Sequence, residues 1–133
     1  MPSIRLSKVL LDYYYIIKNQ QTTESTTLFD VMLLPECSVY KGHFPGMPVA
    51  PGVCNIHMIK ECVERMAEKP LLLESMAKCK FITMITPDQH RELQIHIVST
   101  ESEDNRLKVS ATISRDDTDY VTFKGEFFSM NND

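Results

Sequence analysis

The chain has 133 residues, of which 43% are hydrophobic and 24% charged, with a formal net charge of -4. This size suits one domain, residues 1–133, and the composition excludes disordered, collagen-like and coiled-coil proteins. No lysine or arginine cluster supplies the basic face that nucleic-acid binding needs, and the apolar runs are far shorter than the ~20 residues of a membrane span. We therefore expect neither nucleic acid nor membrane as a partner.

The cysteines and the first residues bear on compartment and cofactor. No basic-then-apolar signal pattern opens the chain, so we expect a cytoplasmic location. The four cysteines show no CxxC spacing, which argues against zinc; in a reducing compartment they behave as small buried hydrophobic residues. They are Cys37, Cys54, Cys62 and Cys79. We predict no metal and no cofactor.

Two strands are predicted at the start of the chain. Residues 12–20 are rich in aromatic and β-branched side chains, which favour strands. Residues 25–33 alternate between polar and apolar side chains, with Thr27, Phe29, Val31 and Leu33 in one register. The polar stretch 21–25 between them is typical of a turn, so the two strands are expected to pair.

One amphipathic helix is predicted over residues 53–69. The segment contains neither proline nor glycine, and Pro70 closes it. At 100° per residue an apolar arc follows one side of this helix, which should pack on a hydrophobic surface. The arc consists of Val53, Ile56, Ile59, Val63, Met66 and Ala67.

Period-2 alternation returns after the helix and predicts four more strands, at 75–85, 92–99, 106–114 and 120–129. In the second of these, Leu93, Ile95 and Ile97 are expected to face inward. Turn-like polar stretches separate the last three strands, which can form an antiparallel meander. One helix against five or six mostly antiparallel strands is an α+β layer design, with the helix as the filling around which the sheet curls.

Glycine, proline and histidine gather in one loop, "KGHFPGMPVAPGVCNIH" (41–57), which holds three of the four glycines of the chain. Proline fixes φ and glycine permits positive φ, so the loop has little conformational freedom. It leads through Pro51 and Gly52 into a helix N-terminus, whose free N–H groups suit a carbonyl oxygen or an anion. With His43 in the loop and His57 in the second helical turn, the pattern indicates carbonyl polarisation coupled to proton transfer.

The stretch "GHFPGMPVAPGV" resembles the signature GHFPGxPxxPGV of the β-hydroxyacyl-(acyl-carrier-protein) dehydratases, the FabZ/FabA-like branch of the hotdog superfamily. The resemblance implies a hotdog fold, a curled sheet around a central helix, and a homodimer or higher oligomer of dimers. It also implies dehydration of a 3-hydroxyacyl thioester to the 2-enoyl thioester, in fatty-acid or polyketide-like synthesis. The acyl group would be carried by acyl carrier protein or coenzyme A.

The same resemblance implies roles for individual residues. His43 matches the histidine that removes the proton α to the thioester carbonyl. The backbone N–H of Gly52 matches the group that polarises this carbonyl, and the match assigns Phe44, Pro51 and Val53 to substrate binding with it. In this family the His43–Phe44 peptide is often in a strained cis form.

The sequence departs from the family at two positions of the helix. The family's second catalytic residue, a glutamate or aspartate, is replaced by His57, and its usual glutamine four residues later is Glu61. An imidazolium can replace a carboxylic acid as the proton donor, because the histidine pKa of ~6.5 lies close to working pH. Glu61, one turn away, can accept a hydrogen bond from His57 or reach the substrate itself, whereas Glu64 and Glu68 are expected on the solvated surface.

Three functions remain open. The first is a thioester dehydratase with His43, His57 and Glu61 as the catalytic residues. The second is a non-catalytic thioester-binding subunit, favoured by the missing acid. The third is a hotdog thioesterase, for which Glu61 is the candidate carboxylate. Lys41, Lys78 and Lys80 are the candidates for a basic patch that would receive an acidic carrier protein; the alternative is that they are ordinary solvated lysines.

Overall fold

The computed structural model describes residues 9–38, 50–87 and 89–129, and over these the chain forms six strands and one helix. They are β1 (Tyr15–Thr23), β2 (Thr26–Leu33), α1 (Gly52–Ala67), β3 (Leu71–Phe81), β4 (Glu92–Ser102), β5 (Arg106–Arg115) and β6 (Thr118–Ser129). The predicted number of strands and the single helix are confirmed for this part of the chain.

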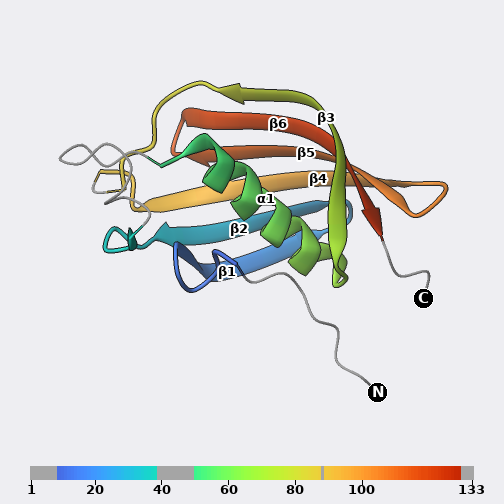
Figure 1. Cartoon of the computed structure of the whole chain (residues 1–133), viewed down its shortest axis with the longest axis horizontal. Coiled ribbons are helices and arrows are strands. Elements are labelled where there is room, and N and C mark those ends of the chain that lie inside the picture. Colours follow the sequence, from blue (N-terminus) through green and yellow to red (C-terminus); the bar gives the residue numbers. More distant parts are fainter. Residues whose placement is uncertain (1–8, 39–49, 88, 130–133) are drawn as a thin grey trace, which may run out of the picture.

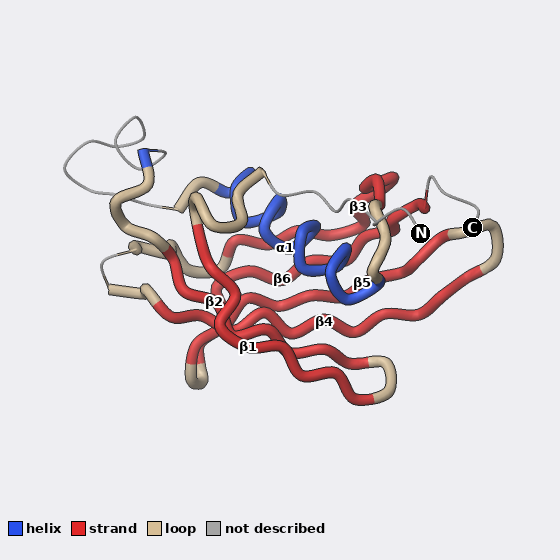
Figure 2. The backbone as a smooth tube through the Cα atoms, turned by 90° about the horizontal axis from the view of Figure 1, so that it is seen from below, coloured by secondary structure: helices blue, strands red, loops and turns tan. Residues whose placement is uncertain are grey.

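The strands form one antiparallel sheet in the order β1-β2-β4-β5-β6-β3. Helix α1 connects β2, near one edge, to β3, which forms the other edge, and it crosses the sheet on the way (Figure 1). Seen from below, the strands run past α1 on one side, and the sheet curls around it (Figure 2). This is the expected hotdog fold.

The alternation of the strand sequences is the reason that the sheet has one buried face. In β2, every second residue from Thr27 to Leu33 is buried, and in β4 the buried residues are Leu93, Ile95 and Ile97. Phe29 lies directly opposite Ile95 in the ladder between β2 and β4, so the apolar side chains of neighbouring strands meet on the concave face. Both predicted registers are confirmed.

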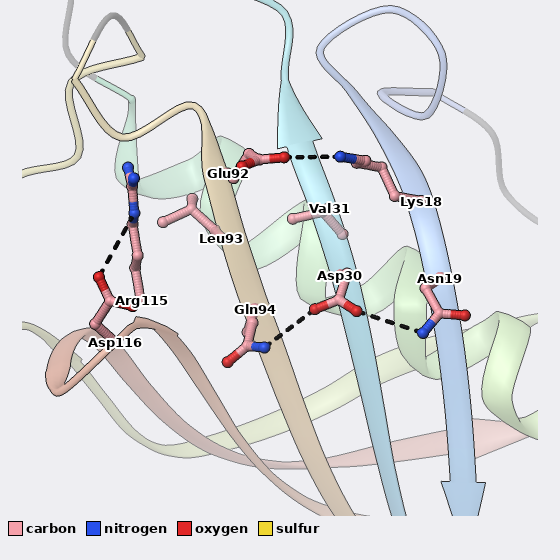
Figure 3. Close-up of a pocket in the computed structure, with 9 residues that line it drawn as sticks. All are labelled: Lys18, Asn19, Asp30, Val31, Glu92, Leu93, Gln94, Arg115 and Asp116. Carbon is pink, nitrogen blue, oxygen red and sulfur yellow. Dashed lines mark hydrogen bonds and ion pairs between the residues drawn. The ribbon is translucent and has the colours of Figure 1, made fainter.

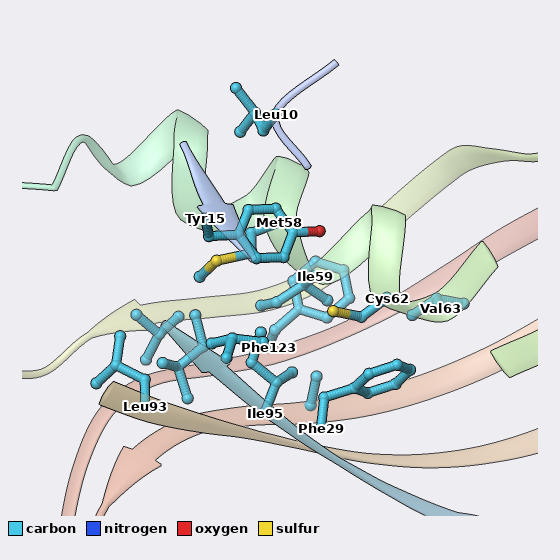
Figure 4. Close-up of a cluster of buried hydrophobic side chains, with 14 of the residues drawn as sticks. Leu10, Tyr15, Phe29, Met58, Ile59, Cys62, Val63, Leu93, Ile95 and Phe123 are labelled. Carbon is cyan, nitrogen blue, oxygen red and sulfur yellow. The ribbon is translucent and has the colours of Figure 1, made fainter. Parts of the chain in front are cut away.

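The core is formed where this concave face meets α1 (Figure 4). The helix contributes Met58, Ile59, Cys62 and Val63, each 0% exposed. The predicted apolar arc is therefore correct at its centre. It is wrong at Val53, in the first helical turn, which is 74% exposed.

Two observed strands begin three or more residues away from their predicted starts. The strand predicted at 75–85 begins at Leu71, directly after the αL residue Glu68 (φ 57°) that ends the helix. The strand predicted at 12–20 begins only at Tyr15, because Asp12 adopts φ 70° in a turn. In both places a positive-φ residue, which composition does not reveal, sets the boundary.

Strand β3 bends as it leaves the helix, since its ladder with β6 contains two register shifts, one between Leu73 and Ser75 and one between Met76 and Lys78. At this bend Gly125 of β6 permits a close approach of the two backbones. A Cβ at Gly125 would lie 2.8 Å from the carbonyl oxygen of Ser75. Glycine is thus required here for packing.

We predict that Gly125→Ala lowers the free energy of unfolding by about 1–3 kcal/mol, because the backbone at Ser75 must shift to admit the methyl group. Urea unfolding monitored by circular dichroism measures the effect. Lys124→Ala, at an exposed position of the same strand, serves as the control and should change the stability by less than about 0.5 kcal/mol. Equal stability of the two variants would contradict the packing argument.

Candidate active site

The N-terminus of α1 presents backbone donors, as the sequence predicted. Pro51 is the N-cap and supplies no side-chain hydrogen bond, and the first turn contains no acidic residue. The carbonyl oxygen of Pro51 accepts from the N–H groups of Cys54 and Asn55, both at 3.1 Å. Gly52 and Val53 come before Cys54 in the chain, and at this end of a helix their N–H groups have no acceptor within the helix. This end of the helix can therefore receive a carbonyl oxygen.

Phe81, at the end of β3, packs directly on this helix terminus. A Cβ at Gly52 would lie 2.8 Å from Cζ of the Phe81 ring, so only glycine allows the observed contact. The ring is 53% exposed. Phe81 was not predicted as a site residue, because nothing in the order of the sequence connects the end of β3 to the start of the helix. The glycine at position 52, where a side chain would collide with Phe81, was the one sequence feature that pointed to it.

His57 lies one turn further along α1, and its side chain is 33% exposed. Its Nε2 atom is buried and lies 3.4 Å from Oε2 of Glu61. The angles of this contact do not make a hydrogen bond, so it is an ion pair when the imidazole is protonated. The structure thus brings the two predicted residues together, but without the hydrogen bond that was expected.

Glu61 is completely buried, and four donors converge on its carboxyl group. The N–H groups of Val9 and Leu10 donate to Oε2 at 2.7 and 2.9 Å. The N–H of Leu11 and the hydroxyl of Tyr15 donate to Oε1 at 3.1 and 3.0 Å. These bonds replace the hydrogen bonds to water that a carboxyl group loses on burial.

The hydrogen bonds that the Glu61 oxygens already accept explain why Nε2 of His57 lies close to the carboxyl group without a hydrogen bond. A carboxylate oxygen offers two in-plane lone pairs, and on Oε2 both are directed at backbone amides, so Nε2 of His57 approaches outside them. Full burial also keeps the Glu61 side chain from reaching a substrate at the helix terminus. Glu61 can therefore supply fixed negative charge beside His57, and it is not placed to exchange protons with a ligand.

The nearest titratable neighbours of Glu61 stay protonated. Burial raises the pKa of Tyr15, and the nearby Cys62 and Glu61 act in the same direction. Burial likewise raises the pKa of the Cys62 thiol to about 12. Both groups are therefore neutral at physiological pH, and Tyr15 serves the carboxylate as a donor.

The remaining predicted residues have different outcomes. Glu64, expected on the surface, is fully buried and accepts the N–H of Leu71 at 2.8 Å, because the chain turns back over the end of α1 into β3. Glu68 is exposed, as expected. Burial raises the pKa of Cys54, which disfavours a thiolate nucleophile there. His43 and Phe44, with the peptide between them, and Lys41 lie outside the described residues.

An open polar depression of about 500 Å³ lies elsewhere, over β1, β2 and β4 on the side of the sheet away from α1 (Figure 3). Its charged and amide side chains already satisfy one another: Lys18 pairs with Glu92 at 2.7 Å, and Asp30 accepts from Gln94 at 3.1 Å. It contains none of the predicted site residues. The helix terminus, with its free donors and His57, remains the candidate active site.

Comparison with known proteins identifies the family. A family model described as "ApeI-like: ApeI dehydratase" matches residues 19–124. The chain belongs to the ApeI-like dehydratase family. The structure is also similar to the dehydratase heterocomplex ApeI:P from Xenorhabdus doucetiae, with a TM-score of 0.68 at 18% identity, covering 85% of this chain and 96% of that one. At this identity the similarity shows the hotdog fold.

Curated relatives confirm the FabZ-like resemblance. The chain is 26% identical over 83 residues to the FabZ 3-hydroxyacyl-[acyl-carrier-protein] dehydratase of Clostridium acetobutylicum, and 32% identical over 82 residues to that of Wolbachia pipientis wMel. These alignments cover 57% and 56% of this chain, and the chain spans only 59% and 57% of the length of these two relatives.

No helix in the described residues is long and apolar enough to cross a membrane.

We predict that Glu61→Ala lowers the free energy of unfolding by at least about 3 kcal/mol, since it leaves three backbone N–H groups without their acceptor and each unsatisfied buried donor costs ~1–3 kcal/mol. Chemical denaturation provides the measurement. Glu68→Ala, at an exposed glutamate of the same helix, is the control and should lose less than about 0.5 kcal/mol. A loss below about 1 kcal/mol for Glu61→Ala would show that water replaces the carboxylate.

Proposed function

We propose that the protein dehydrates a 3-hydroxyacyl thioester to the 2-enoyl thioester, in fatty-acid or polyketide-like synthesis. The observation that carries this proposal is the uncapped N-terminus of α1 beginning at Gly52, directly after the loop that contains His43 and one turn before His57. Membership of the ApeI-like dehydratase family supports the reaction class.

The first half of the reaction removes a proton from the carbon next to the thioester carbonyl. His43 is the base, and the carbonyl oxygen binds at the N–H of Gly52, between Pro51 and Val53. Negative charge develops on this oxygen as the proton leaves, and the helix N-terminus stabilises it. In the CurK dehydratase, a solved structure of similar fold (TM-score 0.51, 14% identity), a histidine-to-phenylalanine variant is described as inactive, which supports a histidine base.

The second half breaks the bond between the β-carbon and the hydroxyl oxygen. The electron pair from the broken C–H bond forms the new double bond, and the hydroxyl leaves as water after taking a proton from His57. Because Nε2 of His57 is buried beside Glu61, Nδ1 is the nitrogen that gives up this proton. Oε2 of Glu61 lies 3.4 Å from Nε2 and forms an ion pair with the imidazole when it is protonated, which is the form that the step requires.

The two other functions fit the site less well. A thioesterase needs a carboxylate that can activate a water, and Glu61 is fully buried with both oxygens occupied by backbone and tyrosine donors. A non-catalytic binding subunit was suggested by the missing acid. Against it, we propose that His57, whose Nε2 lies 3.4 Å from Oε2 of Glu61, takes the place of the missing acid as the proton donor.

Carrier recognition is proposed at the side chains near the end of β3, close to the helix terminus. Acyl carrier protein and coenzyme A both present negative charge beside the thioester, so a net-negative enzyme needs a local basic patch. Lys78 and Lys80 of β3 are exposed and precede Phe81. They are the described lysines placed to serve this role.

We predict that the protein hydrates a short 2-enoyl thioester, the reverse reaction, with loss of the conjugated ultraviolet absorbance. His43→Ala should abolish turnover, and His57→Ala should reduce kcat by about 100-fold or more, the typical contribution of a general acid. His96→Ala, at an exposed position of β4, is the control. Unchanged turnover in His57→Ala would refute its role, and no turnover by the wild type with several acyl lengths on both carriers would favour the binding subunit.

We also propose that two copies associate through β3. Among the described residues, no further strand pairs with either edge of the sheet, and the two edges differ in character. The outer part of β1 exposes polar residues such as Gln20 and Gln21, whereas β3 and the residues after it expose Leu72, Met76, Phe81, Ile82 and Met84. An unpaired edge strand with exposed apolar side chains is typical of an interaction surface. The β3 strand of a second copy would supply both backbone hydrogen bonds and apolar contact.

Met76→Asp is expected to convert the dimer into monomers, because the charge is placed on the apolar edge. Analytical ultracentrifugation of the wild type and the variant measures this. Gln21→Asp, on the opposite edge of the sheet, is the matched control and should remain dimeric. A monomeric wild type would disprove the homodimer and would point to a different subunit at this edge.

A further inference from the structure

One carboxylate attaches the beginning of the described chain to α1. Three consecutive backbone N–H groups, from Val9 to Leu11, and the hydroxyl of Tyr15 all donate to Glu61. We call residues 9–15 the N-terminal arm. Leu10, Leu11 and Tyr15 are buried in the core, so the arm covers part of the helix. Figure 4 shows Leu10 above α1 and the sheet residue Ile95 below it.

The donors around position 61 require a side chain that only accepts hydrogen bonds. A carboxylate meets this requirement, since it has two accepting oxygens and no proton to donate. A glutamine would present an NH2 group to at least one of these donors, and that pair would repel. The glutamate at this position is thus matched to the arm, through contacts 46 to 52 residues apart in the sequence.

The oxygen that holds the arm is also the one beside His57. Oε2 of Glu61 accepts from Val9 and Leu10, and it lies 3.4 Å from Nε2 of His57. With the arm in place, the amides occupy the lone pairs of Oε2 and the imidazole contacts the carboxylate by charge alone. If the arm lifts, these lone pairs are released, and His57 can rotate to form a direct hydrogen bond with Glu61.

We propose that Glu61 is a positioning residue that transmits the placement of the N-terminal arm to the imidazole of His57. The arm is thereby a working part of the site, although it contributes no group that touches the substrate. The inference rests on the proposed function only for the catalytic role of His57; the coupling between arm and imidazole stands on the contacts alone.

The coupling is tested with two substitutions around the Glu61 carboxylate, each with a matched control. Glu61→Gln keeps the shape of the side chain and replaces one acceptor by a donor. Its control is Glu64→Gln, at a glutamate of the same helix that is equally buried and binds Leu71 instead of the arm. Tyr15→Phe removes a single donor to Glu61, and its control is Tyr13→Phe, at a half-exposed tyrosine whose hydroxyl bonds to Ser38.

Three measurements are made on each full-length variant. Hydrogen exchange of the amides of residues 9–11 reports the arm. The Nε2 resonance of His57 in 15N-histidine spectra, assigned by its loss in His57→Ala, reports the imidazole. The kcat and KM for hydration of the enoyl thioester report function.

For Glu61→Gln we expect exchange of the three amides to rise by more than about 10-fold, the Nε2 resonance to move, and kcat to fall with KM nearly unchanged. Tyr15→Phe should raise the exchange by about fivefold, the equivalent of one hydrogen bond of ~1 kcal/mol, and move the same resonance. Neither control should move the resonance or change the exchange of the arm.

An unmoved His57 resonance in a variant whose arm exchanges faster would overturn the coupling. If Glu61→Gln does not fold, Tyr15→Phe decides the question by the same two spectroscopic readouts. A wild type without dehydratase activity, whose resonance nevertheless responds to Tyr15→Phe, would refute the proposed function and leave the coupling intact.

Discussion

A fully buried carboxylate, that of Glu61, is the interaction on which the arrangement of this protein depends. Moving an ion out of water costs several kcal/mol unless hydrogen bonds replace its hydration. Four donors do so here, and they come from residues 9–15. Because the Glu61 carboxylate needs these donors, it fixes the start of the described chain against α1, on a side of the helix that the sheet leaves uncovered.

Wrapping the helix in this way explains why its charged residues do not follow the amphipathic pattern. An isolated surface helix buries one stripe, but α1 is covered by the sheet, by the N-terminal arm and by the turn into β3. Glu61 and Glu64 face the latter two, and each is buried because a neighbouring segment supplies backbone N–H groups. Both glutamates thus act as caps for backbone that has no partner in the sheet.

The sequence predicted the elements that depend on local patterns. The alternation in β2 and β4 has period 2, and the proline and glycine before the helix mark its start, so the starts of these three elements were predicted to within one residue. Glu64, Phe81 and the buried state of Glu61 were not recovered. Each depends on a contact between segments distant in sequence, and in the sequence a buried glutamate at helical spacing is indistinguishable from a solvated one.

The departure of His57 from the FabZ-like signature becomes intelligible together with Glu61. In that signature, a carboxyl group stands at position 57 and an amide four residues later; here a histidine stands at 57 and the carboxylate is one turn, ~5.4 Å, further along the helix. The site keeps one carboxylate and one exposed group that can carry a proton. Oε2 of the buried Glu61, which the arm holds, lies 3.4 Å from Nε2 of His57, so the carboxylate stays next to position 57. His57 and Glu61, the two departures from the FabZ-like signature, thus lie in contact in the structure.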